Sequence, residues 1–221
     1  MINNPKYLNA FRENGQKIKK IKQQLVDFAH TLPSLEEIDK LAEDLILNAG
    51  GKPAFKRVPA YHWTTCICVN DAFVHGIPKG KIKSGDIVTI DLGMYYQNTT
   101  TDTATTFVVG RSTDEQEHFL QVGQDALKKA ISQAQMGNKV VDISRELQDT
   151  VEKEGYNVTR TLTGHGLGKT MHEEPTIPCF VSTDPQLDTV LKEGMVLAIE
   201  SMYMQGDWRL KEDSDGWTLR T

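Results

Sequence analysis

The fold is decided by the stretch Gly85-Asp-Ile-Val-Thr-Ile-Asp-Leu-Gly-Met-Tyr-Tyr-Gln-Asn-Thr-Thr-Thr-Asp-Thr-Ala-Thr-Thr-Phe107. Its first half alternates with a period of two, which is the pattern of a β-strand with one buried face. A turn near residues 97–98 then reverses the chain into a threonine-rich second strand. The stretch therefore predicts an antiparallel β-hairpin.

Two acids of this hairpin, Asp91 and Asp102, are expected to lie close together. A loop at residues 96–97 would place them directly opposite each other, and a loop at 97–98 would make them diagonal neighbours on one face, roughly 5 to 8 Å apart in either case. Two ionised carboxylates at that distance repel unless one is protonated or a cation lies between them. The hairpin alone leaves two interpretations open, a site for divalent ions or an ordinary solvated polar face.

Composition describes an ordinary globular chain, with 221 residues, 38% hydrophobic and 25% charged content, and predicts a single domain over residues 1–221. A net charge of −5 gives no basic footprint for a specific nucleic-acid partner. The polar N-terminus and the absence of a long apolar stretch predict neither a signal peptide nor a membrane span. Three cysteines do not form a disulfide framework, so we expect a cytoplasmic protein.

The order of expected elements repeats. Apolar residues at helical spacing predict helices over 7–32, from the Ser34 capping box to Gly50, over 113–137 and over 142–155. Strands are expected over 64–70, in the hairpin, over 158–163, over 193–204 and from Gly216. Helix, helix and strands thus occur twice, which predicts an α+β fold of two similar halves.

Four further motifs carry chemistry. His165 stands between glycines that allow close backbone approach, as a ligating histidine often requires. His172 begins His-Glu-Glu-Pro, and His75 begins His-Gly-Ile-Pro; a charged turn and a structural histidine are the respective alternatives. Glu200 lies within an apolar stretch that we interpret as a strand, where an acid needs a cation or a hydrogen-bond donor.

With these motifs in this order, the sequence resembles the type I methionine aminopeptidases of the bacterial kind, from about Leu8 to its last residue. The resemblance implies the pita-bread fold, in which two pseudo-symmetric halves of helices pack on a curved antiparallel sheet around a di-metal centre. It implies removal of the initiator methionine from nascent chains when the next residue is small. It also implies a monomer, with the ribosome surface as a further partner and no membrane partner.

The resemblance also implies residue roles. It assigns two divalent ions, of Co, Mn, Fe or Zn, to the ligands Asp91, Asp102, His165 and Glu200. Glu200 would in addition handle the proton of the attacking water. His172 would hydrogen-bond the scissile carbonyl, and His75 would contact the scissile amide or the following residue.

The same resemblance places Tyr61, Cys66 and Trp217 in the pocket for the methionine side chain, with an ordinary core role as the alternative. The chain departs from the family pattern at three positions near the motifs, the first being Val74, which stands where a cysteine frequently precedes the first histidine. Met171 stands where an aromatic residue commonly precedes the second histidine, and Ser201 stands where proline usually follows the metal glutamate. We expect these changes to reshape the pocket without removing the chemistry.

Two other functions remain open. One is a prolidase or Xaa-Pro aminopeptidase with a similar ligand set, and the other is a catalytically impaired binding protein of the same fold. The second arises because the family's last bridging glutamate would follow the turn Asp215-Gly216-Trp217 at a position beyond Thr221. The sequence therefore leads us to expect a truncated form that holds metals weakly and has little activity.

Overall fold

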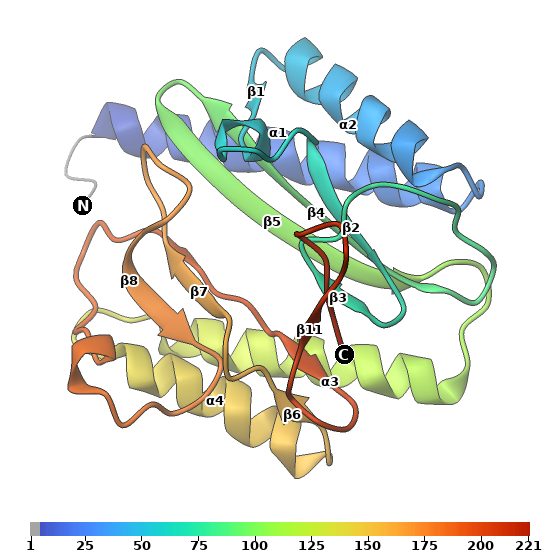
Figure 1. Cartoon of the computed structure of the whole chain (residues 1–221). Coiled ribbons are helices and arrows are strands. Elements are labelled where there is room, and N and C mark those ends of the chain that lie inside the picture. The colour runs from blue at the N-terminus through green and yellow to red at the C-terminus, as the bar shows by residue number, and fades with distance from the viewer. Residues whose placement is uncertain (1–4) are drawn as a thin grey trace.

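The computed structural model describes residues 5–221. The first half consists of α1 (Pro5–Ala29), α2 (Leu35–Asn48), β1 (Lys52–Pro53), the 3-10 helix η1 (Phe55–Arg57), β2 (Thr65–Val69), β3 (Ala72–Val74), β4 (Ile87–Tyr96) and β5 (Thr99–Val108). The second half consists of α3 (Asp114–Gln133), α4 (Val140–Lys153), β6 (Asn157–Val158), β7 (Thr163–Gly166), β8 (Glu173–Pro178), η2 (Pro185–Leu187), β9 (Leu197–Ala198), β10 (Tyr203–Met204), β11 (Lys211–Glu212) and β12 (Leu219–Arg220). The predicted repeat of two helices followed by strands is therefore present, and the halves lie side by side (Figure 1).

The β4–β5 hairpin is the longest strand pair among the described residues, and it runs through the middle of the molecule (Figure 1). Tyr96 pairs with Thr99, so the loop is Gln97-Asn98, and both loop residues have positive φ, at 46° and 65°. Positive φ at both central positions is the signature of a type I′ turn, whose twist matches that of the strands. This is the second of the two registers that the sequence allowed.

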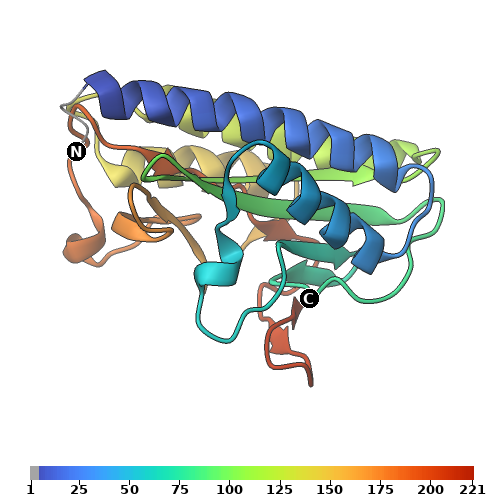
Figure 2. The ribbon, with the colours of Figure 1, turned by 90° about the horizontal axis from the view of Figure 1, so that it is seen from above.

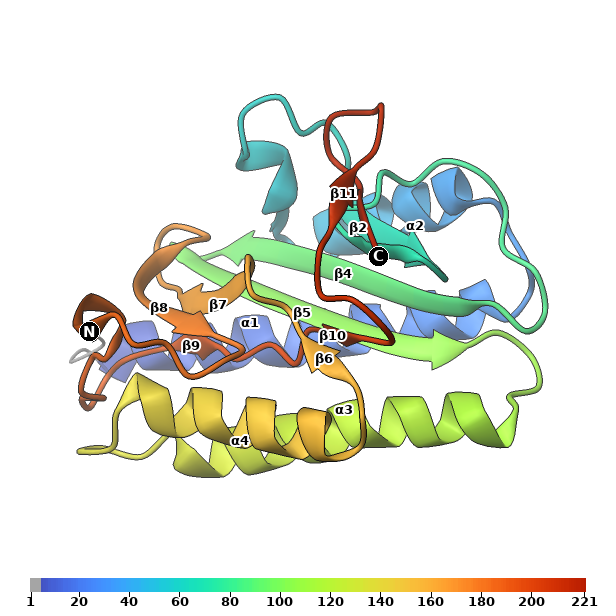
Figure 3. The same cartoon turned by 60° about the horizontal axis from the view of Figure 1, so that its bottom comes forward.

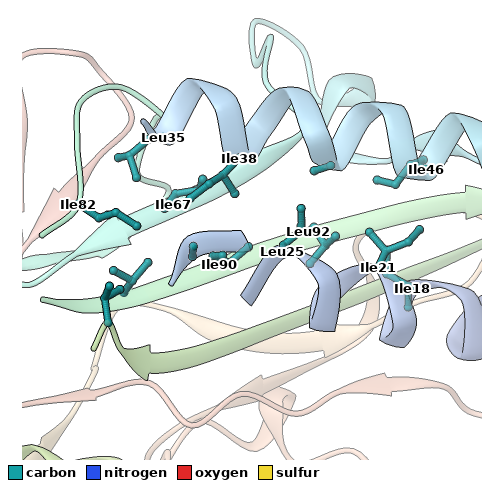
Figure 4. Close-up of a cluster of buried hydrophobic side chains, with 14 of the residues drawn as sticks. Ile18, Ile21, Leu25, Leu35, Ile38, Ile46, Ile67, Ile82, Ile90 and Leu92 are labelled. Carbon is teal, nitrogen blue, oxygen red and sulfur yellow. The ribbon is translucent and has the colours of Figure 1, made fainter. Parts of the chain in front are cut away.

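The buried face of β4 builds the first core. Val88, Ile90, Leu92 and Met94 are all 0% exposed, as the period-two pattern predicted. They pack against the apolar faces of α1 and α2 and against Ile67 of β2 (Figure 4). Burying such side chains stabilises the fold by roughly 1.5 to 3 kcal/mol each. The hairpin is thereby fixed against the helices.

Both predicted capping boxes form. The Ser34 hydroxyl accepts from the Glu37 amide at 3.2 Å, and the Glu37 carboxylate accepts from the Ser34 amide at 2.7 Å. Thr113 and Gln116 make the equivalent pair at the start of α3. Each box satisfies two amide groups that a helix N-terminus otherwise leaves without partners.

The second core lies between the α3–α4 pair and the short strands β6 to β10 (Figure 3). Ile143, Leu147 and Val151 form the inward stripe of α4, and none is more than 1% exposed. The C-terminal segment then returns to the first half, where β12 pairs with β3. Figure 2 shows α1 on one side of the hairpin and this C-terminal segment on the other.

Two strand predictions in the second half are wrong. The stretch 193–204 is not one strand, since β9 pairs with β7 whereas β10 pairs with β6, and Glu200 lies in the connection between them. The stretch 158–163 is not a strand either, because β6 ends at Val158 and β7 starts at Thr163. Backbone pairing with different partners divides both stretches. No helix within residues 5–221 is long and apolar enough to cross a membrane.

Candidate active site

Asp91 and Asp102 are diagonal neighbours across the hairpin. Asp91 pairs with Ala104 in the β4–β5 register, and Asp102 pairs with Gly93. Close packing requires glycine at position 93, because a Cβ atom there would lie 2.8 Å from both the Met171 methyl carbon and the Thr101 carbonyl oxygen. The two acids therefore share the face of the hairpin that looks away from the core.

His165 reaches these acids from the other half of the molecule. It lies on β7, where its imidazole Nε2 is 3.5 Å from Asp102 Oδ2 and 3.7 Å from Glu200 Oε1. A Cβ atom on Gly164 would lie 2.3 Å from the Ala198 carbonyl oxygen, and one on Gly166 would lie 2.2 Å from the Glu174 carbonyl oxygen. Close strand approach thus requires glycine on both sides of His165, as the motif suggested.

Burial and neighbouring charges raise the pKa values of Asp91 and Glu200. Burial, together with the charges of Asp102 and Glu200, raises the pKa of Asp91 well above its usual range. Burial and the charge of Asp102 raise the pKa of Glu200 to about 7, against a smaller opposing effect of His165. Burial lowers the pKa of His165, but hydrogen bonding to Asp102 and to the Gly166 carbonyl outweighs it, so the pKa of His165 is raised. The site therefore carries an excess of negative charge that a cation would relieve.

The donor set suits a divalent ion, although the side chains are not closed around one. Three carboxylates and one imidazole are hard and borderline ligands of the kind that Mn, Fe and Co accept. Within residues 5–221, no group of three or more His, Cys, Asp or Glu side chains has an arrangement that could hold a metal ion as it stands. The four predicted ligands therefore meet in one place but would have to move closer together to coordinate an ion.

His172 and His75 lie beside this group. The rings of His165 and His172 are 4.4 Å apart, in an edge-to-face arrangement. Burial, followed by the nearby His165, lowers the pKa of His172, and burial, followed by His172, lowers the pKa of His75. His75 also has a φ of 56°, a left-handed conformation that non-glycine residues rarely adopt and that is enriched at functional sites. Both imidazoles are thus favoured in their neutral form, and His172 lies next to the His165 ring and interacts with Asp102.

The three residues assigned to a methionine pocket gather in one cluster. Tyr61 and Cys66 are buried, the Tyr61 hydroxyl donates to Cys66 Sγ at 3.1 Å, and the rings of Tyr61 and Trp217 are 5.0 Å apart. Phe55 is the third buried member of this group. We call Phe55, Tyr61, Cys66 and Trp217 together the aromatic cluster. Cys66 pairs with Asp91 in the β2–β4 register, so the aromatic cluster adjoins the acids.

Two residues of α1 support the site although the sequence did not single them out for it. Asn14 is 0% exposed and donates to the Met94 carbonyl at 3.0 Å and to the Thr99 hydroxyl at 2.9 Å. Lys22 donates to the Thr103 hydroxyl at 2.6 Å and to the Ala104 carbonyl at 3.0 Å, in the two residues that directly follow Asp102 on β5. A polar residue within the apolar stripe of the helix is the signal that could have identified Asn14.

Comparisons with known proteins agree with this geometry. A model of a family described as metallopeptidase family M24 matches residues 9–218. A methionine aminopeptidase of Clostridium perfringens is 35% identical over 222 residues, which cover 100% of this chain and 88% of that protein. The crystal structure of methionine aminopeptidase from Thermotoga maritima superposes with a TM-score of 0.92 and 34% identity, covering 100% of this chain and 89% of that one.

A prolidase is also similar but less so. Prolidase from Pyrococcus furiosus superposes with a TM-score of 0.77 and 25% identity, and covers 91% of this chain but only 59% of that one. The chain therefore belongs to metallopeptidase family M24 and, within it, to the methionine aminopeptidases. The family expected from the motifs, the α+β pita-bread fold and the metal-dependent aminopeptidase class are confirmed.

Proposed function

We propose that this protein removes the N-terminal methionine from nascent chains whose second residue is small, through one catalytic domain. The observation that carries the proposal is the position of His165, whose Nε2 lies 3.5 Å from Asp102 Oδ2 and 3.7 Å from Glu200 Oε1. Asp102 comes from the first half and the other two residues from the second half of a fold shared with methionine aminopeptidases. The buried free cysteines Cys66, Cys68 and Cys179 support a reducing compartment, which we take to be the cytoplasm.

The four ligands proposed for two divalent ions are Asp91, Asp102, His165 and Glu200. Such ions supply Lewis acidity and activate water at neutral pH. Asp102 lies within reach of both Asp91 and His165, so it is the residue best placed to serve as a shared ligand. The oxygen-rich set with a single imidazole favours Mn, Fe or Co over a thiolate-type zinc centre.

The remaining chemistry falls to side chains that can move or donate protons. Glu200 accepts a proton from the attacking water and returns it to the leaving amine. His172, kept neutral by its lowered pKa, donates an N–H to the scissile carbonyl oxygen as negative charge develops there. His75 contacts the scissile amide or the residue that follows it.

The aromatic cluster supports the choice of methionine as the first residue. Tyr61, Cys66 and Trp217 present apolar and polarisable surface, and thioether sulfur makes favourable contacts with aromatic rings. The similarity to prolidase covers a smaller part of that protein and is weaker in identity, which disfavours the prolidase alternative.

The test measures hydrolysis of Met-Ala-Ser and Ala-Pro peptides with Mn or Co, together with metal content by mass spectrometry. We expect release of methionine and no turnover of the proline peptide. Turnover of Ala-Pro alone would assign a prolidase instead. Peptide binding without turnover in the metal-loaded protein would assign a binding protein that has lost catalysis.

A further inference from the structure

A cavity of about 130 Å³ lies beside the candidate active site, lined by Ala54, Arg57, Val58, Thr100, Thr170 and Met171. Two of these residues, Val58 and Met171, also pack against the aromatic cluster. They therefore form a wall shared by the cluster on one side and the cavity on the other. A side chain that enters along the aromatic cluster would meet this wall at its far end.

The wall contains a side chain that adapts readily. Met171 is partly buried and precedes His172 in the chain, and its methyl carbon lies against Gly93. Methionine has three rotatable bonds and a polarizable thioether, so it moves aside more easily than a rigid ring would. Val58 is small and only partly buried. A modest change at Met171 would thus join the cavity to the space next to the aromatic cluster.

The lining of the cavity suits an apolar occupant. Ala54, Val58 and Met171 present carbon and sulfur to it. The Thr100 hydroxyl donates to the Lys169 carbonyl at 3.1 Å, and the Thr170 hydroxyl lies 3.0 Å from a carboxylate oxygen of Glu173, so their protons already have acceptors. Arg57 is exposed to water, and its guanidinium lies 4.0 Å from the centre of the Tyr95 ring. None of these groups requires a polar ligand within the cavity.

We propose that this cavity extends the pocket for the substrate's first side chain, so that the site accepts unbranched apolar side chains longer than methionine. This proposal rests on the proposed function, because it takes the aromatic cluster as the place where that side chain binds. Engineered apolar cavities of about 150 Å³ are large enough to bind benzene. The cavity here is therefore large enough for the few additional methylene groups of a longer chain.

The test compares peptides Xaa-Ala-Ser in which Xaa is methionine, norleucine, 2-aminoheptanoic acid or 2-aminooctanoic acid. Norleucine has the length of methionine, and the other two are one and two carbons longer. For the unmodified protein we expect the kcat/KM for 2-aminooctanoic acid to lie within about tenfold of that for norleucine. A closed pocket commonly discriminates by about 10- to 200-fold per methylene.

The variant Met171→Phe replaces the adaptable side chain by a rigid ring and should lower the ratio of the two kcat/KM values at least tenfold. Lys56→Gln is the control. Lys56 lies next to the cavity-lining residue Arg57 in the 3-10 helix η1, but it is exposed, pairs with Glu43 and does not line the cavity. This control should leave the ratio unchanged. Using the ratio makes the result independent of any overall loss of activity.

The proposal is overturned if the kcat/KM of the unmodified protein for 2-aminooctanoic acid is more than about tenfold below that for norleucine, or if Met171→Phe leaves the ratio unchanged. Hydrolysis of Met-Ala-Ser alongside either result would leave the proposed function intact. Binding of the free amino acids norleucine and 2-aminooctanoic acid, measured by calorimetry, gives the same comparison without turnover. If the unmodified protein binds the two amino acids equally and Met171→Phe binds 2-aminooctanoic acid more weakly than norleucine, the result supports the extended pocket even where no peptide is cleaved.

Discussion

Asp102 lies opposite Gly93 in the central hairpin, two residue pairs along from Ala104, which is the residue that faces Asp91 directly. The diagonal placement is set by the two-residue turn Gln97-Asn98. It keeps both carboxylates on one face of the hairpin and places Gly93 of β4, rather than a second acid, opposite Asp102. His165 then approaches Asp102 from the other half, at 3.5 Å. One turn type in the first half and one glycine-flanked strand in the second thus determine the geometry of the acids.

The variant Asp102→Asn should lose metal and activity together. If Asp102 is the ligand that we propose, a neutral amide cannot replace its negative charge, although asparagine is nearly the same size as aspartate. Metal content after loading with Mn, measured by mass spectrometry, should fall well below that of the parent protein. Asp125→Asn, at an exposed position on α3, is the control and should keep its metal. Full metal occupancy in Asp102→Asn would reject the assignment of this residue as a ligand.

The variant His172→Ala should retain metal but turn over Met-Ala-Ser about a hundred- to a thousand-fold more slowly, the usual effect of losing one oxyanion donor. His118→Ala removes an exposed histidine of α3 whose imidazole Nε2 lies 3.5 Å from Glu154 and which is not among the candidate site residues, and it should keep full turnover. Steady-state kinetics at saturating metal make the comparison. An undiminished kcat in His172→Ala would show that this imidazole does not stabilise the oxyanion.

Hydrophobic periodicity was sufficient to predict the helices and the hairpin, because one face of each is buried in a single core. It was insufficient for β8 and for the 193–204 stretch. β8 contains Pro175 and begins with two glutamates, so nothing in its local pattern indicates a strand; pairing with β7 creates it. Glu200 appeared to lie within one strand because Leu197 and Met202 flank it with apolar residues, whereas strand pairing divides that stretch between two partners.

The meeting of the site residues followed from the motifs only through the family resemblance. Spacing along the chain cannot show that His165 and Asp102, 63 positions apart, come within 3.5 Å, because that proximity depends on how the two halves pack. The aromatic cluster is similar, since Trp217 reaches Tyr61 only after β12 has paired with β3. The adaptable wall formed by Val58 and Met171 is visible only in three dimensions.

The variant Asn14→Ala should destabilise the fold by about 1 to 3 kcal/mol, the cost of leaving buried partners without a hydrogen bond. The amide of Asn14 joins α1 to the Met94 carbonyl and to the hydroxyls of Thr99 and Thr101, next to Asp102. Urea denaturation measures the change. Gln16→Ala, at an exposed position on the same helix, is the control and should change the free energy of unfolding by less than about 0.5 kcal/mol. Equal effects of the two substitutions would show that the buried amide contributes no more than an exposed one.

The pH dependence of stability in the metal-free protein should change when Glu200 is replaced. The pKa of Glu200 is raised from 4.5 to about 7 in the folded state, so the folded chain holds this proton more tightly than the unfolded chain does. The contribution of Glu200 to stability is therefore full below about pH 4.5 and is lost as the pH rises towards 7. The raised pKa values of Asp91 and His165 act in the same direction as that of Glu200, and the lowered pKa values of His75 and His172 act in the opposite direction, so the parent curve alone does not isolate Glu200. Glu200→Gln lacks the titrating group, and its stability relative to the parent should therefore increase from pH 5 to pH 8 when both are measured in urea with a chelator.

Added Mn should then stabilise the parent more at pH 8 than at pH 5, because the ion competes with protons for the carboxylates. A stability difference between the two proteins that stays constant across this range would show that Glu200 ionises in the folded chain as readily as it does in water.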